Sequence, residues 1–246
     1  MRREELNSVI ASVRAYLELE RESGIDECYF SADEIKPAVT EGAPKDLEAL
    51  KKEVLGCRGC DLCETRTNVV FGAGNPRAKL LFIGEAPGQE EDKQGLPFVG
   101  RAGQLLTKII EAMGLGREDV YIANILKCRP PNNRAPLPIE ILACQDNIKR
   151  QVEIIKPRVI CTLGKFASQT LLRTETPISA LRGNFREYPA THLTSGGIPP
   201  ERDKWRDNGI KVMPTFHPAY LLRNPEDKKL VWQDMKKVMK ELKERN

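Results

Sequence analysis

Residues 79–88 read Lys79-Leu-Leu-Phe-Ile-Gly84-Glu-Ala-Pro-Gly88, and this segment decides the fold class because it joins a short apolar run to a loop of small residues. An apolar run of this length that ends at a glycine is typical of a strand buried on both faces. A helical pattern follows from about Ala102 to Met113. Strand, loop and helix in this order predict one unit of a parallel sheet covered by helices.

The same alternation repeats toward the C-terminus. Three further apolar runs predict strands at 120–126, 158–164 and 210–216. Helical patterns follow these runs from Pro138 onward, at 165–172 and at 227–243, and proline suits the first turn of a helix. We therefore expect an α/β fold, a three-layer αβα sandwich around a central, mostly parallel four-stranded sheet.

The two ends of the chain differ in pattern. Residues 4–22 repeat apolar side chains at helical spacing, and the polar stretch 31–45, with its two prolines, predicts a linker. We expect residues 1–46 to form an N-terminal helix and linker, and residues 47–246 to form the main domain. The polar, Gly- and Pro-containing segment 188–208 predicts a surface insertion.

The composition indicates a protein of the cytoplasm that contacts no membrane. No apolar run approaches the length that a membrane helix needs, and the N-terminal residues lack the apolar stretch of a secretory signal. The net charge of +4 is too small to identify a partner by itself. The chain has seven cysteines, and because disulfides are disfavoured in the cytosol, clustered cysteines point to metal or redox chemistry.

Four cysteines are candidate metal ligands: a CxxC pair, a cysteine at a strand end and one on the helix that follows it. These are Cys57, Cys60, Cys128 and Cys144. Four thiolates can hold a [4Fe–4S] cluster or a zinc ion, and the spacing does not separate the two. The spacing also leaves Cys63 open as a ligand, whereas Cys161 lies within an apolar strand and is expected in the core.

Three loops begin where predicted strands end, and ligands of parallel sheets bind at this edge. The loops start at Gly84, Asn124 and His217 and run through about 100, 134 and 225. Together with the CxxC pair, their motifs closely resemble the family 4 uracil-DNA glycosylases, the iron–sulfur branch of that superfamily. The resemblance spans about residues 47–243. The related branch that forms a covalent DNA adduct has Gln at the position of Ala86, family 5 has a Gly-Leu-Ala-Pro-Ala motif, and family 1 has an Asp there and no cluster.

The resemblance implies that the chain is a monofunctional hydrolase that cuts the N-glycosidic bond of uracil in DNA and leaves an abasic site for base excision repair. It assigns the [4Fe–4S] cluster, in a structural role, to Cys57, Cys60, Cys128 and Cys144, and leaves Cys63 unassigned. The expected partner is uracil-containing DNA, single- or double-stranded. We expect a cytoplasmic, nucleoid-associated monomer.

The resemblance also implies a set of residues that bind the base after it is flipped out of the DNA. The amides around Ala86 and Gly88 approach the base, and Phe98 stacks on it. Asn124 pairs with the O4 and N3–H edge of uracil, since an amide offers both a donor and an acceptor. His217 is assigned as the donor to uracil O2. Glu91 is assigned as the side chain that crowds C5, with Glu90 and Asp92 as alternatives.

The chemistry and the DNA contacts are less directly indicated. The obvious general base of family 1 is missing, and we expect Asn133 to position water and Glu85 to order the loop. Phosphate contacts are predicted for Arg129, Arg134, Lys127 and Arg223, with Leu221 or Leu222 as the wedge that fills the gap left by the base. Two rival hypotheses are a non-catalytic DNA-binding protein and a zinc-bearing adaptor; binding alone needs neither Asn124 nor His217.

Overall fold

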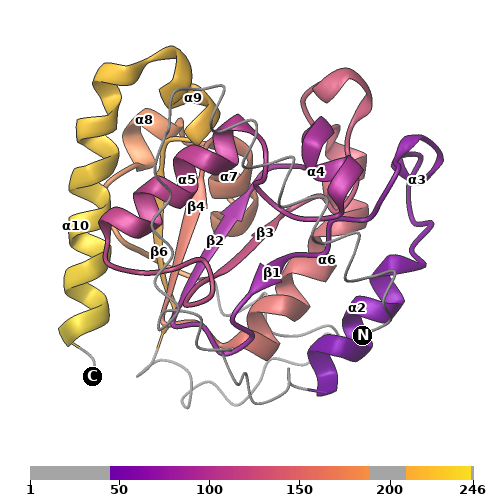
Figure 1. Cartoon of the computed structure of the whole chain (residues 1–246), viewed down its shortest axis with the longest axis horizontal. Coiled ribbons are helices and arrows are strands. Elements are labelled where there is room, and N and C mark those ends of the chain that lie inside the picture. Colours follow the sequence, from indigo (N-terminus) through magenta and orange to yellow (C-terminus); the bar gives the residue numbers. More distant parts are fainter. Residues whose placement is uncertain (1–44, 189–208, 245–246) are drawn as a thin grey trace, which may run out of the picture. The chain divides into compact units, whose positions relative to one another are not determined.

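The central sheet has four parallel strands and a short antiparallel strand at each edge. In the computed structural model, which describes residues 45–188 and 209–244, the strand order is β1-β3-β2-β4-β6-β5 (Figure 1). The parallel strands are β2 (Leu80–Gly84), β3 (Tyr121–Asn124), β4 (Val159–Leu163) and β6 (Lys211–Thr215). The α/β prediction is confirmed, but the sheet has six strands where four were expected. The two additional strands, β1 (Ala73–Gly74) and β5 (Arg186–Glu187), are too short to leave an apolar run in the sequence.

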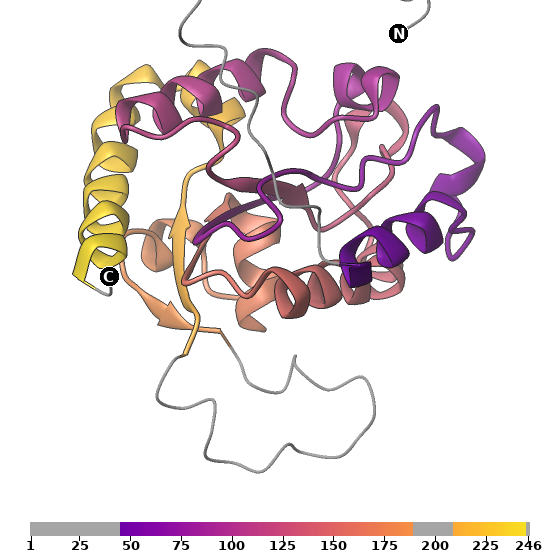
Figure 2. The ribbon, with the colours of Figure 1, turned by 60° about the horizontal axis from the view of Figure 1, so that its bottom comes forward.

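Helices cover both faces of the sheet, so the three-layer prediction is also confirmed. Leu81 and Ile83 of β2 pack with α2 (Lys45–Leu55), α6 (Pro138–Ile155) and α7 (Lys165–Leu172). The alternate residues Leu80 and Phe82 pack on the other face with α5 (Arg101–Ala112), α9 (Pro218–Arg223) and α10 (Lys228–Glu244). In Figure 2 the yellow α10 and magenta α5 lie across the strands from the salmon α6. This two-sided burial explains why each parallel strand is a continuous apolar run.

Five shorter elements occupy the connections between these layers. They are α3 (Leu62–Thr65), α4 (Gln89–Gln94), η1 (Pro131–Asn133), α8 (Ile178–Leu181) and η3 (Pro225–Asp227). The helix α4 follows the end of β2, and η1 follows the end of β3. The third loop, after β6, folds into α9, so all three loops marked by the sequence contain short helical elements beside the carboxyl edge of the sheet.

The predicted element boundaries agree with the structure to within about two residues where the chain is described. Lys45 and Asp46, which were expected in the linker, begin α2. The predicted helix at 4–22 and nearly all of the predicted insertion at 188–208 lie outside the described residues, and the domain boundary at residue 46 stays a prediction. None of the helices in the described ranges is both long and apolar enough to cross a membrane.

Candidate active site

The site begins with two glycines at the ends of neighbouring central strands. Gly84 ends β2 directly across from Asn124 of β3, and a Cβ at Gly84 would lie 2.4 Å from the Asn124 Oδ1 atom and 2.5 Å from the Phe98 ring. Gly164 follows β4 in a left-handed conformation (φ 89°), and a Cβ there would lie 3.0 Å from the Cβ of His217. The missing side chains leave room for the Asn124 amide and the Phe98 ring at Gly84, and for the His217 side chain at Gly164.

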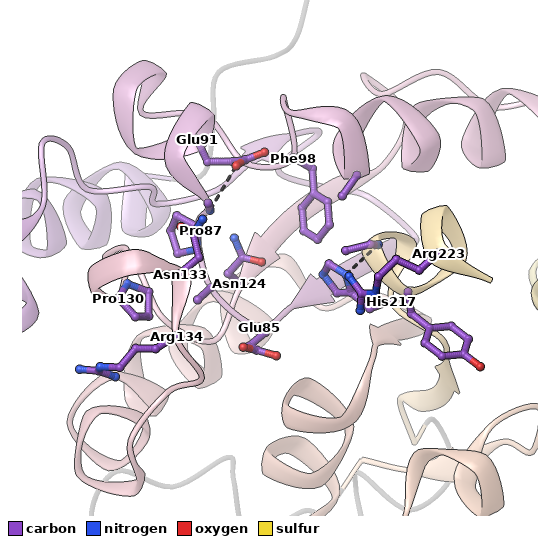
Figure 3. Close-up of a pocket in the computed structure, with 15 residues that line it drawn as sticks. Glu85, Pro87, Glu91, Phe98, Asn124, Pro130, Asn133, Arg134, His217 and Arg223 are labelled. Carbon is purple, nitrogen blue, oxygen red and sulfur yellow. Dashed lines mark hydrogen bonds between the residues drawn. The ribbon is translucent and has the colours of Figure 1, made fainter. Parts of the chain in front are cut away.

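The side chains of Asn124, Phe98 and His217 line one pocket of about 420 Å³. Figure 3 shows the Phe98 ring, the Asn124 amide and the His217 imidazole around the same space. Ten of the residues predicted for the site line it: Glu85, Ala86, Gly88, Glu91, Phe98, Asn124, Asn133, Arg134, His217 and Arg223. The sequence therefore predicted most of the pocket wall, while Arg129 and Leu222 lie outside the lining.

Asn124 carries a buried polar atom that has no partner in the protein. The residue is 1% exposed, and its Oδ1 atom makes no hydrogen bond among the described residues. Lys127, which is equally buried, donates from Nζ to the Asn124 carbonyl (2.8 Å) and to the Gln151 Oε1 atom (2.6 Å). These hydrogen bonds fix the main chain of Asn124. The amide oxygen faces the pocket and is available to a donor from a ligand. Such a donor would be favoured, because a buried acceptor without a partner costs free energy.

His217 is held as a neutral donor. Its Nδ1 atom accepts a hydrogen bond from the Ala219 N–H (3.1 Å), so the proton of the neutral imidazole resides on Nε2. Burial, reinforced by the positive charge of Arg223, lowers the pKa of His217 to about 4. The imidazole is therefore uncharged near neutral pH and carries a fixed N–H on Nε2.

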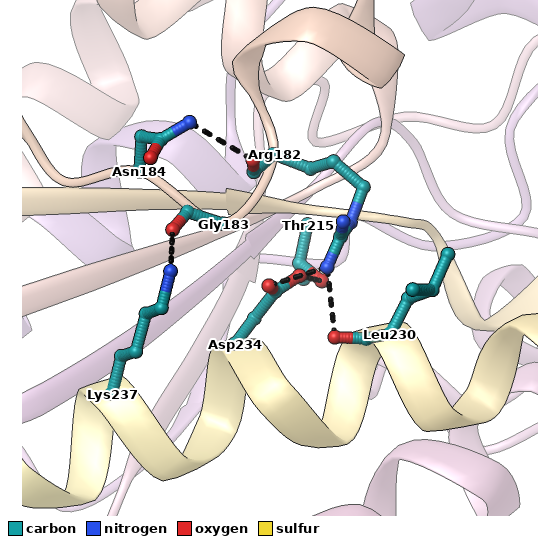
Figure 4. A network of polar contacts seen from close by, with 7 residues as sticks. All are labelled: Arg182, Gly183, Asn184, Thr215, Leu230, Asp234 and Lys237. Carbon is teal, nitrogen blue, oxygen red and sulfur yellow. Dashed lines mark hydrogen bonds and ion pairs between the residues drawn. The ribbon is translucent and has the colours of Figure 1, made fainter.

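A buried ion pair supports the C-terminal end of β6 (Figure 4). Asp234 of α10 is 1% exposed; it binds Arg182 at 2.6 Å and accepts a hydrogen bond from the Thr215 hydroxyl at 2.6 Å. Arg182 also donates to the Leu230 carbonyl (2.8 Å) and lies 5.4 Å from the centre of the Phe216 ring. Since Thr215 and Phe216 immediately precede His217, the network joins α10 to the strand end that leads to the imidazole.

Glu91 ties together the two loops that follow β2. Its carboxylate accepts hydrogen bonds from the N–H groups of Gly88 (3.1 Å), Val99 (2.8 Å) and Gly100 (2.8 Å). The expectation that the Gly88 amide is free to meet the base is therefore wrong, because that N–H already has a partner. The Ala86 N–H makes no hydrogen bond within the described residues and remains available.

Glu85 and Asn133 have different surroundings from those expected. Glu85 was expected to order the loop, but among the described residues its carboxylate makes no hydrogen bond or ion pair; Glu91 has that role. Burial raises the pKa of Glu85, which lies at the pocket wall. Asn133 lies on η1 in a left-handed conformation (φ 54°), and its Oδ1 atom accepts a hydrogen bond from Arg129 Nε at 2.7 Å.

The predicted DNA contacts separate into free and engaged side chains. Lys127 is buried and cannot reach a phosphate, so that prediction is wrong. Arg134 is bound to the buried carboxylate of Glu140, whereas the exposed Arg223 makes no hydrogen bond or ion pair among the described residues. Leu221 is fully buried and Leu222 is 40% exposed, which leaves Leu222 as the candidate wedge.

The four candidate ligand cysteines gather from three elements. Burial first, and then the nearby thiols of Cys144 and Cys57, raise the pKa of Cys60; burial, Cys144 and Cys60 likewise raise the pKa of Cys128 to about 11. Cys63 contributes to neither shift, and its thiol donates to the adjacent Glu64. Across residues 45–188 and 209–244, no three His, Cys, Asp or Glu side chains are close enough together to hold a single metal ion.

Three of these sulfur atoms each accept a hydrogen bond from an N–H group. Arg66 donates to the Cys128 Sγ atom (3.1 Å), the Lys127 main chain donates to Cys144 (3.4 Å), and the Gly59 main chain donates to Cys57 (3.4 Å). N–H donors around sulfur stabilise thiolates and are typical of the surroundings of bound clusters.

Comparisons with known proteins agree with this geometry. The family model described as the uracil DNA glycosylase superfamily matches residues 71–236. The chain belongs to this superfamily. It is similar to the Type-4 uracil-DNA glycosylases of Archaeoglobus fulgidus (42% identity, covering 79% of this chain and 92% of the relative), Sulfurisphaera tokodaii (44%; 78% and 83%) and Thermotoga maritima (44%; 78% and 92%).

Three residues around this superfamily pocket were not identified from the sequence. Arg117 binds the main chain of the Phe98 loop, Arg66 binds the sulfur of Cys128, and Gly103 of α5 leaves room for the Phe98 backbone. The glycine was the one visible signal, because glycine inside a helix is unfavourable and indicates a close backbone approach. The two arginines lie outside every motif and could not be distinguished from surface cations.

Proposed function

We propose that this chain is a uracil-DNA glycosylase that hydrolyses the N-glycosidic bond of uracil in DNA. The observation that carries the proposal is the buried, unpartnered Oδ1 atom of Asn124, beside the Phe98 ring and across the pocket from a neutral His217. Membership of the superfamily and the similarity to Type-4 enzymes support the same activity.

The pocket distinguishes uracil from cytosine through the Asn124 amide. Uracil N3–H donates to Oδ1, and uracil O4 accepts from the Asn124 Nδ2 group. Cytosine presents an acceptor at N3 and an amino group at C4, which would leave buried groups of the site unpaired, and this mismatch strongly disfavours binding. Phe98 supplies the stacking surface, and its ring centre lies 5.7 Å from that of His217.

The reaction separates charge, and the pocket has a group for each sign. As the bond between C1′ and the base breaks, its electron pair moves to the base, and the Nε2–H of His217 and the N–H of Ala86 stabilise the resulting negative charge on uracil oxygen. The carboxylate of Glu85 faces the pocket and favours the positive charge that develops on the sugar. Water then adds to C1′, and its proton passes to the departing uracil anion directly or through solvent. Asn133, which lines the pocket, is proposed to orient that water.

Access to the pocket requires that the nucleotide leave the base stack. Leu222, on the exposed side of α9, is proposed to fill the gap in the stack, and Arg223 to hold the neighbouring phosphate. Single- and double-stranded DNA are both proposed substrates, and the protein is proposed to act on the nucleoid DNA as a monomer.

The donor set fits a [4Fe–4S] cluster held by Cys57, Cys60, Cys128 and Cys144. Cys60 lies near Cys57 and Cys144, Cys128 lies near Cys60 and Cys144, and N–H groups point at three of the four sulfurs. When bound, such a cluster supplies four covalent cross-links that join the segment before α3 to the end of β3 and to α6. Purified protein should be brown with broad visible absorbance and about four iron atoms per chain. A colourless, zinc-loaded protein would contradict the assignment.

The activity is tested with labelled oligonucleotides that carry one uracil opposite guanine, opposite adenine or in single strands, with thymine as the control base. Alkali-dependent cleavage at uracil alone is expected. It should be lost in the Asn124→Ala/His217→Ala variant and retained in a Glu111→Ala variant, which changes an exposed side chain at the far end of α5.

One outcome would redirect the proposal, and a second experiment tests the role of Glu91. DNA binding without cleavage by cluster-loaded protein would favour a non-catalytic role. Cleavage at thymine by a Glu91→Ala variant would support the predicted crowding of C5 by Glu91; no thymine cleavage would leave Glu91 with its loop-ordering role alone.

A further inference from the structure

Phe98 has a backbone conformation that an aromatic residue rarely adopts. Its φ is 53°, in the left-handed region, which costs free energy in any residue with a Cβ atom. Such a conformation persists only where the surroundings hold it, and it is common at functional sites. The contacts that hold Phe98 therefore determine where the stacking surface lies.

Two charged side chains bind the main chain on either side of this residue. Arg117, in the turn between α5 and β3, donates to the carbonyls of Pro97 (2.8 Å) and Phe98 (2.9 Å). Glu91 accepts from the next two main-chain N–H groups, those of Val99 and Gly100, both at 2.8 Å. The cation of Arg117 thus binds the carbonyl oxygens on the Phe98 segment, and the anion of Glu91 binds the N–H groups that follow.

Two glycines, one beside the main chain of Phe98 and one beside its ring, leave the space that this residue occupies. A Cβ at Gly103 of α5 would lie 2.0 Å from the carbonyl carbon and oxygen of Phe98, so the loop can rest on the helix only at a glycine. A Cβ at Gly84 would lie 2.5 Å from the ring. With its main chain held by Arg117, Phe98 has its ring beside Gly84 in the lining of the pocket.

Arg117 itself does not line the pocket. Its guanidinium is partly buried and also donates to the Thr107 hydroxyl (3.0 Å). Burial lowers the pKa of Arg117, and the negative charge of Glu91 opposes this effect. Both carbonyl bonds depend on the forked guanidinium, because a lysine presents one compact charge in their place.

We propose that Arg117 is a positioning residue for Phe98, which sets the affinity of the pocket for the flipped base and leaves the affinity for the DNA backbone unchanged. This inference rests on the proposed function, since it takes Phe98 as the surface on which uracil stacks.

The test compares Arg117→Met, Arg117→Lys, Phe98→Leu and the Arg117→Met/Phe98→Leu double variant with the wild type. Lys108→Met, which removes an exposed cation from α5, is the matched control. Three quantities are measured: the single-turnover rate of uracil excision, inhibition by free uracil, and affinity for an oligonucleotide with an abasic-site analogue. A thermal unfolding scan confirms that each variant is folded.

Arg117→Met should lower the rate and the affinity for free uracil each by about tenfold, as expected for partial loss of one base-stacking contact. Affinity for abasic DNA should stay as in the wild type. The double variant should be no slower than Phe98→Leu, because both changes act on one contact. Arg117→Lys should recover part of the loss, and Gly103→Ala should reproduce it from the opposite side of the loop.

The inference would be overturned by independent, multiplicative effects of the two substitutions, by an unchanged rate in Arg117→Met, or by equal losses of uracil and DNA affinity. If Arg117→Met does not fold, Arg117→Lys and Gly103→Ala carry the same comparison. An inactive wild-type protein would overturn the proposed function and this inference together, whereas an active wild type with unaltered variants would overturn the inference alone.

Discussion

Charged side chains hold both walls of the pocket, a partly buried pair on the Phe98 wall and a largely buried pair on the His217 wall. On the Phe98 wall, Arg117 and Glu91 bind the main chain of the loop that carries the base-contacting residue. On the His217 wall, Asp234 and Arg182 bind each other, and they reach the strand end through the Thr215 side chain. The first pair sets the position of one ring, whereas the second joins α10 to the sheet. We therefore expect the first to affect function most and the second to affect stability most.

The largest effect on stability is expected from Asp234→Ala. The substitution leaves the charge of Arg182 largely buried without its partner, which typically destabilises a protein by about 3–5 kcal/mol. Urea unfolding measures the loss, and the excision rate per folded molecule should remain close to that of the wild type. Glu244→Ala, which removes an exposed pair with Lys240 on the same helix, should cost at most about 0.5 kcal/mol. Equal losses of unfolding free energy in the two variants would contradict the expectation that the buried pair stabilises the protein more than the exposed pair does.

The next effect is a pH dependence that arises from His217. The unfolded chain binds a proton at this residue near pH 6.5, whereas the folded protein excludes it until about pH 4. Stability should therefore fall as the pH decreases through this window, by about 3 kcal/mol at pH 4 for a shift of this size. Unfolding measured against pH in the wild type and in His217→Asn isolates this contribution. Excision should not change through titration of His217 between pH 5.5 and 8.

A smaller effect on stability is expected from Glu91→Gln on the Phe98 wall. The amide cannot accept all three main-chain N–H groups, and loss of a hydrogen bond to a charged group costs about 1.5–3 kcal/mol. The excision rate should fall as well, because the loop that carries Phe98 loosens. Glu90→Gln is the control, since the side chain of this exposed neighbour binds only Lys93 among the residues that the structure describes. A stable variant with the wild-type rate would show that Glu91 does not order the loop.

The smallest effect on function is expected from Arg223, one of two arginines that line the pocket. Arg223→Ala should weaken DNA binding modestly and reduce the slope of log affinity against log salt by about one, the value for one phosphate contact. Arg134→Ala should instead lower stability, because it leaves the buried Glu140 without its partner. Binding titrations at several salt concentrations and unfolding curves separate the two. A reduced salt slope in Arg134→Ala alone would reverse the assignment.

The sequence predicted the parts of the site that are mounted on regular structure. Asn124 and His217 could be placed because each follows an apolar run whose length and ending define a strand, and parallel strands end at one edge. The loop contacts could not be predicted in this way. The bond from Arg117 to Phe98 depends on a left-handed backbone and on a glycine in the following helix, so no local pattern contains it. Lys127 was misplaced for a related reason: burial of its side chain depends on Gln151, which is distant in the sequence.

The short edge strands also bear on self-association of the protein. β1 and β5 are two residues long and antiparallel to their neighbours, so within the described chain each edge of the sheet offers little main chain for another strand to join. Long unpaired edges are the usual templates for aggregation. The short edges therefore disfavour intermolecular sheets between copies of this chain.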